Sequence, residues 1–100
     1  SLNVKTRIEV FDPSGPLRFD NGEARIENIS CGGAYLSNIV LKHGSLPEES
    51  VLFRLRVNEK PLEDWKADSL VVRHEKDAAG VKYVSIAKEE KNKIIDLFES

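Results

Sequence analysis

The alternation of apolar and polar residues between positions 51 and 58, which only Leu52 interrupts, is the feature that most constrains this chain. Every second position is apolar: Val51, Phe53, Leu55 and Val57. Leu52, Arg54, Arg56 and Asn58 stand between them. Successive side chains of a β-strand point to opposite faces, so this period of two predicts a strand with one buried face. We expect Arg54 and Arg56 to share the outward face and to be solvated.

The same alternation predicts further strands on both sides. In a strand at 4–11, one face would hold Val4, Thr6, Ile8 and Val10, and the other Lys5, Arg7 and Glu9. In a strand at 23–29, Ala24, Ile26 and Asn28 would face one way, and Arg25, Glu27 and Ile29 the other. A turn at 12–16 contains proline and glycine, and Gly32-Gly33 predicts a bulge or a positive-φ bend.

Three more strands are predicted at 33–36, 65–74 and 80–87, the last two joined as a hairpin by residues 76–79. The period changes only after residue 88, where good helix formers and an apolar stripe predict one amphipathic helix over about 89–99. We expect Ile94, Leu97 and Phe98 to pack on the strands, and Trp65 to belong to the core. About six short strands favour a closed barrel or a small sandwich, because closure leaves no unpaired sheet edge.

Composition argues against several classes of function. Lys and Arg total 15 against 17 for Asp and Glu, a net charge of -2, which argues against DNA or RNA as a partner. No stretch approaches the roughly 18 to 20 apolar residues of a membrane-spanning helix, and no signal peptide is recognisable, so we expect one cytoplasmic domain over residues 1–100. Cys31, His43 and His74 lack the spacing of metal ligands, and no orienting acid accompanies Cys31. We expect no metal, no catalysis, and a buried Cys31.

The most informative stretch is Asn28-x-Ser30-x-x-Gly33, between two predicted strands. The side-chain oxygen of Asn28 can accept hydrogen bonds from guanine, and the Ser30 hydroxyl can reach a phosphate or cap a turn. Gly33 permits a close approach of ligand that a Cβ would obstruct. Taken alone, these residues are also typical of an Asx-type turn followed by a strand bulge.

The motif is followed by predicted strands that contain Val71-Val72-Arg73 and Gly80-Val81-Lys82-Tyr83. With this order of segments, the chain resembles the PilZ domain family over nearly its whole length. The resemblance implies a mainly β fold, a six-stranded antiparallel barrel with a C-terminal α-helix packed near it. It also implies a non-catalytic bacterial receptor domain that binds the second messenger cyclic di-GMP, with no other cofactor.

In this family two motifs bind the ligand: an Asp/Asn-x-Ser-x-x-Gly segment and an Arg-x-x-x-Arg segment upstream of it. By its distance from Asn28, Arg7 stands at the second arginine of the upstream motif, and Asn3 replaces the first. Lys5 lies on the same strand face as Arg7 and can supplement it. The ligand residues implied are therefore Arg7, Asn28, Ser30, Gly33 and Lys5.

Three functions are compatible with the sequence. The first is a signalling receptor in which cyclic di-GMP orders the N-terminal segment, and which acts on a downstream protein or on other domains of a longer parent chain. The second, supported by Asn3, is a PilZ-like interaction module that has lost the nucleotide and acts in pilus assembly or motility. The third is an unrelated barrel for single-stranded nucleic acid, which the low aromatic content of 7% disfavours.

Overall fold

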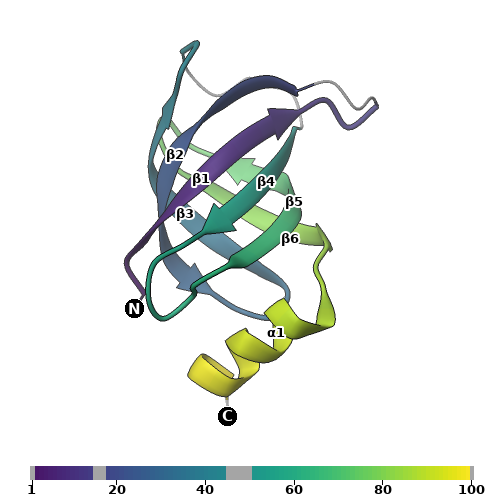
Figure 1. Ribbon diagram of the computed structural model, residues 1–100. Coiled ribbons are helices and arrows are strands. Elements are labelled where there is room, and N and C mark those ends of the chain that lie inside the picture. The colour runs from purple at the N-terminus through teal and green to yellow at the C-terminus, as the bar shows by residue number, and fades with distance from the viewer. Residues whose placement is uncertain (1, 15–17, 45–50, 100) are drawn as a thin grey trace.

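The alternating segments form six strands that close into a barrel (Figure 1). The computed structural model describes residues 2–14, 18–44 and 51–99. The strands are β1 (Val4–Phe11), β2 (Arg18–Ile29), β3 (Gly33–Leu41), β4 (Leu52–Val57), β5 (Trp65–His74) and β6 (Ala79–Ser85). They pair antiparallel in the order β1-β2-β3-β6-β5-β4, and β4 pairs again with β1. The expectation of a mainly β fold with a six-stranded antiparallel barrel and a C-terminal helix is confirmed.

The barrel interior holds the apolar faces that the alternation predicted. In β1, Val4, Thr6, Ile8 and Val10 are buried, whereas Lys5 and Arg7 are exposed. Trp65 and Phe53 are the largest fully buried side chains, so the expectation of a core tryptophan is confirmed. The Trp65 ring meets Tyr83 edge to face, with 5.8 Å between the ring centroids.

Two strands run further than the pattern indicated. β2 begins at Arg18, because its first, mostly polar residues pair with β1. Within this segment the buried Asp20 accepts hydrogen bonds from the backbone amides of Asn21 and His43. β3 continues to Leu41 past Asn38, whose φ of 51° interrupts the alternation. Ile39 and Leu41 point into the interior again after this interruption. The break in the alternation is the reason that the pattern predicted only the first half of the strand.

The chain ends in α1 (Lys88–Ile94), which continues as a wider π-helical turn, η1 (Ile95–Glu99), below one end of the barrel (Figure 1). The indole Nε1–H of Trp65 donates to the carbonyl of Glu90 at 3.0 Å, and Ile94 is fully buried. The expectation that Leu97 and Phe98 pack on the barrel is wrong, since they are 46% and 42% exposed. The helix meets the barrel through its first two turns only, so the last turn extends away from it.

In the part of the chain that the structure describes, no helix has both the length and the apolar character needed to cross a membrane.

Candidate functional site

The Asn-x-Ser-x-x-Gly motif occupies the hairpin that joins β2 to β3. The backbone amide of Ser30 donates to the carbonyl of Gly33 at 2.9 Å. The Ser30 hydroxyl oxygen accepts from the amides of Gly32 and Gly33 at 3.2 and 3.3 Å. Ser30 therefore holds the turn closed, as the turn interpretation of the motif expected, and Cys31 at its tip is half-buried against the core rather than fully buried.

Asn28 points outward because of a β-bulge. The pairing of β2 with β3 shifts between Ile26 and Asn28, so one extra residue stands on β2 at this point. An extra residue reverses the alternation that follows it. Asn28 is consequently exposed, while Ile29 packs against the core. The expectation that Asn28 shares a face with Ala24 and Ile26 is wrong, and the correction places its carboxamide where a ligand can reach it.

Gly33 is required by the approach of β6 rather than by an unusual backbone angle. A Cβ at Gly33 would lie 2.1 Å from the carbonyl oxygen of Val81, whereas a Cβ at Gly32 would meet nothing within 4 Å. Neither glycine has a positive φ, and the bulge lies earlier in β2. The bulge or positive-φ bend predicted at these two glycines is therefore replaced by close contact between strands.

The strand register continues from Asn28 across the outer surface of the barrel. Asn28 lies opposite Tyr35 of β3, Tyr35 opposite Gly80 of β6, and Gly80 opposite Arg73 of β5. The Arg73 guanidinium lies over the Tyr35 ring at 5.8 Å from its centroid, and the Tyr35 hydroxyl donates to Glu75 at 3.2 Å. Partial burial and the contact with Glu75 raise the pKa of Tyr35.

Sequence reasoning assigned no ligand role to Tyr35 or Arg73, because their proximity depends on the pairing of β3, β6 and β5. The strand predicted at 33–36 contains Tyr35, but the pattern says nothing about which outward side chains of other strands lie next to it. We define Asn28, Tyr35 and Arg73 as the motif row. An amide, an aromatic ring and a guanidinium are together suited to a purine with a polar edge.

The two basic residues predicted for the site lie further along the barrel. Arg7 is opposite Glu23 of β2, which is five positions before Asn28, roughly 16 Å at about 3.3 Å per residue. Lys5 is opposite Arg25, closer to Asn28, but its ammonium pairs with Glu23 at 2.8 Å. The structure thus brings Asn28, Ser30 and Gly33 together and leaves Arg7 apart from them.

Two other residues lie nearer to Asn28 than Arg7 does. The first is Arg25, which is exposed on β2 three positions before Asn28. The second is Asn3, because the amide of the preceding residue, Leu2, donates to the carbonyl of Glu27 at 3.0 Å. That bond places the exposed Asn3 beside the end of β2. The alternation of β2 showed Arg25 on the polar face, but only the bulge places Asn28 outward with it.

Metal ligation has no support in the described residues, where no group of three His, Cys, Asp or Glu side chains is gathered as metal ligands are.

The closed six-stranded barrel and terminal helix place the chain among small β-barrels, here with the Asn-x-Ser-x-x-Gly hairpin joining β2 to β3. A family model described as PilZ domain matches residues 2–100, so the chain belongs to the PilZ domain family. This is a family of cyclic di-GMP receptors, and its domains are generally non-catalytic. Searches of curated proteins and of solved structures found no match to this chain.

Proposed function

We propose that this chain is a receptor for cyclic di-GMP and that the ligand binds on the outer wall of the barrel at the β2–β3 hairpin. One observation carries the proposal: the bulge in β2 and the Ser30 turn present the exposed Asn28 beside Gly33 in a chain that belongs to the PilZ family. A ligand with two guanines and two phosphates needs hydrogen-bond acceptors, flat surfaces and cations.

The motif row supports recognition of guanine. The carboxamide oxygen of Asn28 accepts from the guanine N1–H or N2–H, which phosphate-only ligands lack. Tyr35 and the guanidinium of Arg73 provide π surfaces on the same row, and Arg73 can also fork onto the O6 and N7 edge. Ser30 acts through the shape of the turn, because its hydroxyl already accepts two backbone amides.

Cations for the phosphates come from β2 and from its neighbour β1. Arg25 lies closest to Asn28 on β2, Lys5 lies opposite Arg25 on β1, and Arg7 lies further along the same outward face. Lys5 exchanges its contact with Glu23 for a phosphate, at little cost because both side chains are about half exposed, 50% and 53%. Arg7 reaches the ligand through its long, forked side chain.

Signal output follows from the position of the N-terminal segment. Leu2 is tied to β2 through the amide bond to Glu27 and packs its side chain against the core, so this segment runs directly beside the motif. A ligand that contacts both Asn3 and Asn28 stabilises one placement of the segment over others. Its effect on that equilibrium equals its difference in affinity for the two placements.

Calorimetric titration of cyclic di-GMP, GTP and GMP tests the proposal. We expect cyclic di-GMP to bind in preference to both mononucleotides, and Asn28→Ala to weaken it about tenfold or more through loss of a guanine contact. Asn92→Ala on the exposed face of α1 is the matched control and keeps the wild-type affinity. Absence of heat and of competition at about 100 μM, roughly -5.5 kcal/mol, contradicts the proposal.

A second candidate is an interaction module that no longer binds the nucleotide. Asn3 in place of an arginine beside the motif, and the existing ion pair of Lys5 with Glu23, favour it. The same titration separates the two, because the interaction module gives no heat with any of the three nucleotides.

A further inference from the structure

The outer face of three neighbouring strands carries three cations in register. Arg7 of β1 lies opposite Arg56 of β4, and Arg56 lies opposite Lys66 of β5. All three are exposed, and we call them the cationic row. Like charges directly opposite one another on a sheet destabilise it. An anion bound between these side chains would offset that repulsion.

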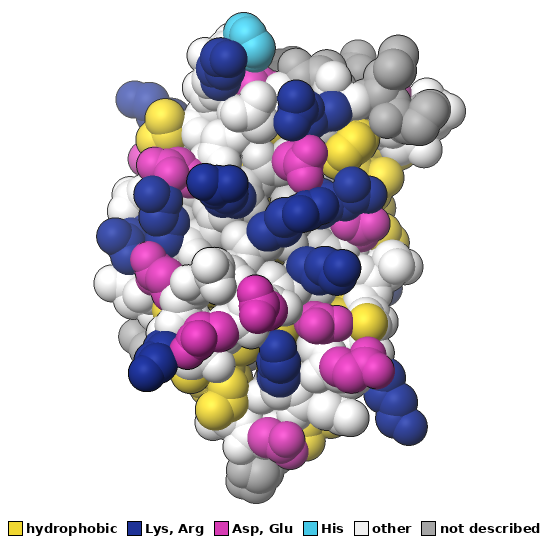
Figure 2. Space-filling view, in the orientation of Figure 1, with side chains coloured by type: hydrophobic (Ala, Val, Ile, Leu, Met, Phe, Trp, Pro, Cys, Tyr) yellow, Lys and Arg dark blue, Asp and Glu magenta, His cyan; other side chains and the backbone are white. Residues whose placement is uncertain are grey.

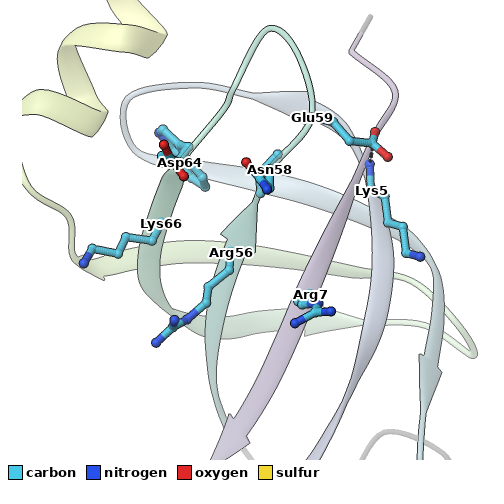
Figure 3. A pocket seen from close by; sticks show the side chains of 9 residues that line it. Lys5, Arg7, Arg56, Asn58, Glu59, Asp64 and Lys66 are labelled. Atoms are coloured by element: carbon cyan, nitrogen blue, oxygen red, sulfur yellow. Dashed lines mark hydrogen bonds between the residues drawn. The ribbon is translucent and has the colours of Figure 1, made fainter.

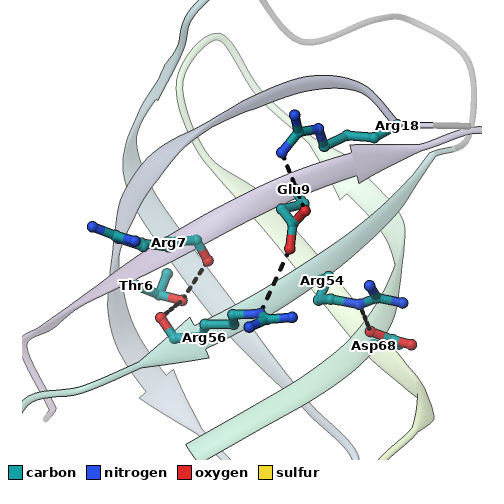
Figure 4. A network of polar contacts seen from close by, with 7 residues as sticks. All are labelled: Thr6, Arg7, Glu9, Arg18, Arg54, Arg56 and Asp68. Carbon is teal, nitrogen blue, oxygen red and sulfur yellow. Dashed lines mark hydrogen bonds and ion pairs between the residues drawn. The ribbon is translucent and has the colours of Figure 1, made fainter.

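The row two positions further along the same strands has matched charges. Glu9 lies opposite Arg54, and Arg54 lies opposite Asp68. The Arg54 Nε–H donates to Asp68 at 2.9 Å, and the Arg54 guanidinium lies over the Phe11 ring at 4.9 Å. Arg54 is thus paired and half-buried rather than simply solvated, which corrects the expectation from the alternation. We call Glu9, Arg54 and Asp68 the matched row (Figure 4).

The residues of the cationic row are less fully paired with carboxylates than Arg54 is in the matched row. No carboxylate of the described residues forms an ion pair with Arg7 or Lys66. Arg56 has Glu9 at 3.6 Å, but Glu9 is shared with Arg18 at 3.4 Å. Figure 2 shows Lys and Arg side chains gathered over the middle and upper parts of this face, with Asp and Glu more frequent toward its lower end.

The three cations line an open hollow of about 590 Å³ between β1 and the β4–β5 loop (Figure 3). This volume is in the range of small-molecule sites. Lys5, Glu59 and Asp64 also line it, and Glu59 accepts the backbone amide of Lys5 at 3.0 Å. Lys5 is already paired with Glu23 at 2.8 Å, so Arg7, Arg56 and Lys66 supply the positive charge of the hollow.

We propose that this hollow is a second ligand site, which binds a small phosphorylated molecule through Arg56 and Lys66 together with Arg7. A phosphate group carries about -1.5 to -2 charges near neutral pH and presents three oxygens, so it can contact several of these cations at once, whereas a carboxylate carries a single charge. Two guanidinium groups fork onto phosphate oxygens and the lysine adds a point charge. The Trp65 ring is buried, at 1% exposure, so the hollow recognises the phosphate rather than an aromatic base.

The site is distinct from the motif row. In the barrel β1 stands between β2, which carries Asn28, and β4 and β5, which carry Arg56 and Lys66. Arg7 and Lys5 are shared between the two proposals, since both were also candidate contacts for cyclic di-GMP and both line the hollow. Substitutions at Arg56 and Lys66 therefore test the second site without altering the first.

Titration with pyrophosphate and inorganic phosphate, followed by NMR amide shifts and by calorimetry, is the experiment. We expect pyrophosphate to bind, and Arg56→Gln and Lys66→Gln each to weaken it about tenfold. Each substitution also leaves the melting temperature unchanged or raises it, because a repulsion within the row is removed. Arg54→Gln, in the matched row of the same strand, is the control: it keeps pyrophosphate affinity and lowers the melting temperature.

Four results overturn the second site. The first is the absence of pyrophosphate binding at about 10 mM, and the second is equal loss of binding in Arg54→Gln, which reveals a diffuse charge effect. The third is a Lys66→Gln variant that weakens cyclic di-GMP as much as pyrophosphate, which makes the row part of the nucleotide site. Binding of a single-stranded oligonucleotide but not of pyrophosphate also contradicts a small ligand. Failure of Asn28→Ala to affect cyclic di-GMP bears only on the first site.

Discussion

The Arg73 guanidinium reaches the ring of Tyr35 across Gly80, which stands between them in the register of β3, β6 and β5. Gly80 has no side chain to separate the two groups, and they approach to 5.8 Å between the guanidinium carbon and the ring centroid. The pair lies on the same outward row as Asn28. It gives the Asn-x-Ser-x-x-Gly hairpin a flat, positively charged neighbour that is absent from the motif itself.

The titration of Tyr35 tests its contact with Glu75 without any ligand. Partial burial, then the hydrogen bond to Glu75, raise its pKa above the ordinary 10.0. Folding then favours the protonated phenol, so this contribution to stability is complete below pH 10.0 and is lost as pH rises through the folded-state pKa. We expect Glu75→Gln to lower the Tyr35 pKa in an ultraviolet absorbance titration, with Tyr35→Phe to identify its signal. An unchanged pKa in Glu75→Gln contradicts the contact.

Asn3→Arg is expected to tighten cyclic di-GMP binding by roughly 10- to 100-fold, since a charge-assisted hydrogen bond contributes about 1.5 to 3 kcal/mol. The bond from Leu2 to Glu27 places position 3 beside the end of β2, the strand that carries Asn28. Stability should barely change, because Asn3 is exposed. Calorimetry with Asn3→Lys in parallel shows whether charge alone suffices. Equal affinities for Asn, Lys and Arg place this position outside the ligand site.

Arg7→Lys and Arg7→Ala distinguish a forked contact from a solvated side chain. If Arg7 binds a phosphate or guanine of cyclic di-GMP, lysine restores little, because it keeps the charge but loses the planar, bidentate geometry. The expected order of affinity is arginine first, with lysine close to alanine. Binding should also weaken with salt, which screens exposed charges over about 8 to 10 Å. Identical titrations of the three proteins remove Arg7 from the cyclic di-GMP site.

The pair Gly33→Ala and Gly32→Ala separates strand packing from turn conformation. A Cβ at Gly33 would meet the carbonyl of Val81 at 2.1 Å, so strand β6 must shift, and we expect a loss of about 1 to 3 kcal/mol in the free energy of unfolding. Gly32 faces open space and has no positive φ, so its substitution stays within about 0.5 kcal/mol. Urea unfolding measures both. Similar losses from the two variants contradict this account of Gly33.

Ile94→Ala is expected to lower the free energy of unfolding by about 2 to 5 kcal/mol, because Ile94 is the fully buried contact of α1. Leu97→Ala, in the last turn, removes a side chain that is 46% exposed and should change stability by no more than about 0.5 kcal/mol. Thermal and urea unfolding of the two variants provide the comparison. Equal destabilisation would mean that the last turn also packs on the barrel.

Much of the architecture was predictable from local pattern. The faces of β1 and β4, the core position of Trp65, the β5–β6 hairpin and the terminal helix all follow from apolar spacing within one segment. The turn role of Ser30 was recognisable because turn chemistry is also local, whereas the reason for Gly33 lies in the approach of β6. Membership of the PilZ family was suspected from the order of these same segments, and the family match confirms it.

The sequence by itself determined which segments become strands and which of their faces is apolar, because side chains alternate along any extended backbone. The tertiary structure decided which outward residues are neighbours. The bulge that turns Asn28 outward, the meeting of Tyr35 with Arg73, and the alignment of Arg7 with Arg56 all depend on how one strand pairs with another. Pairing follows from closing the barrel around a shared core, and one extra residue on a strand reverses every side chain beyond it.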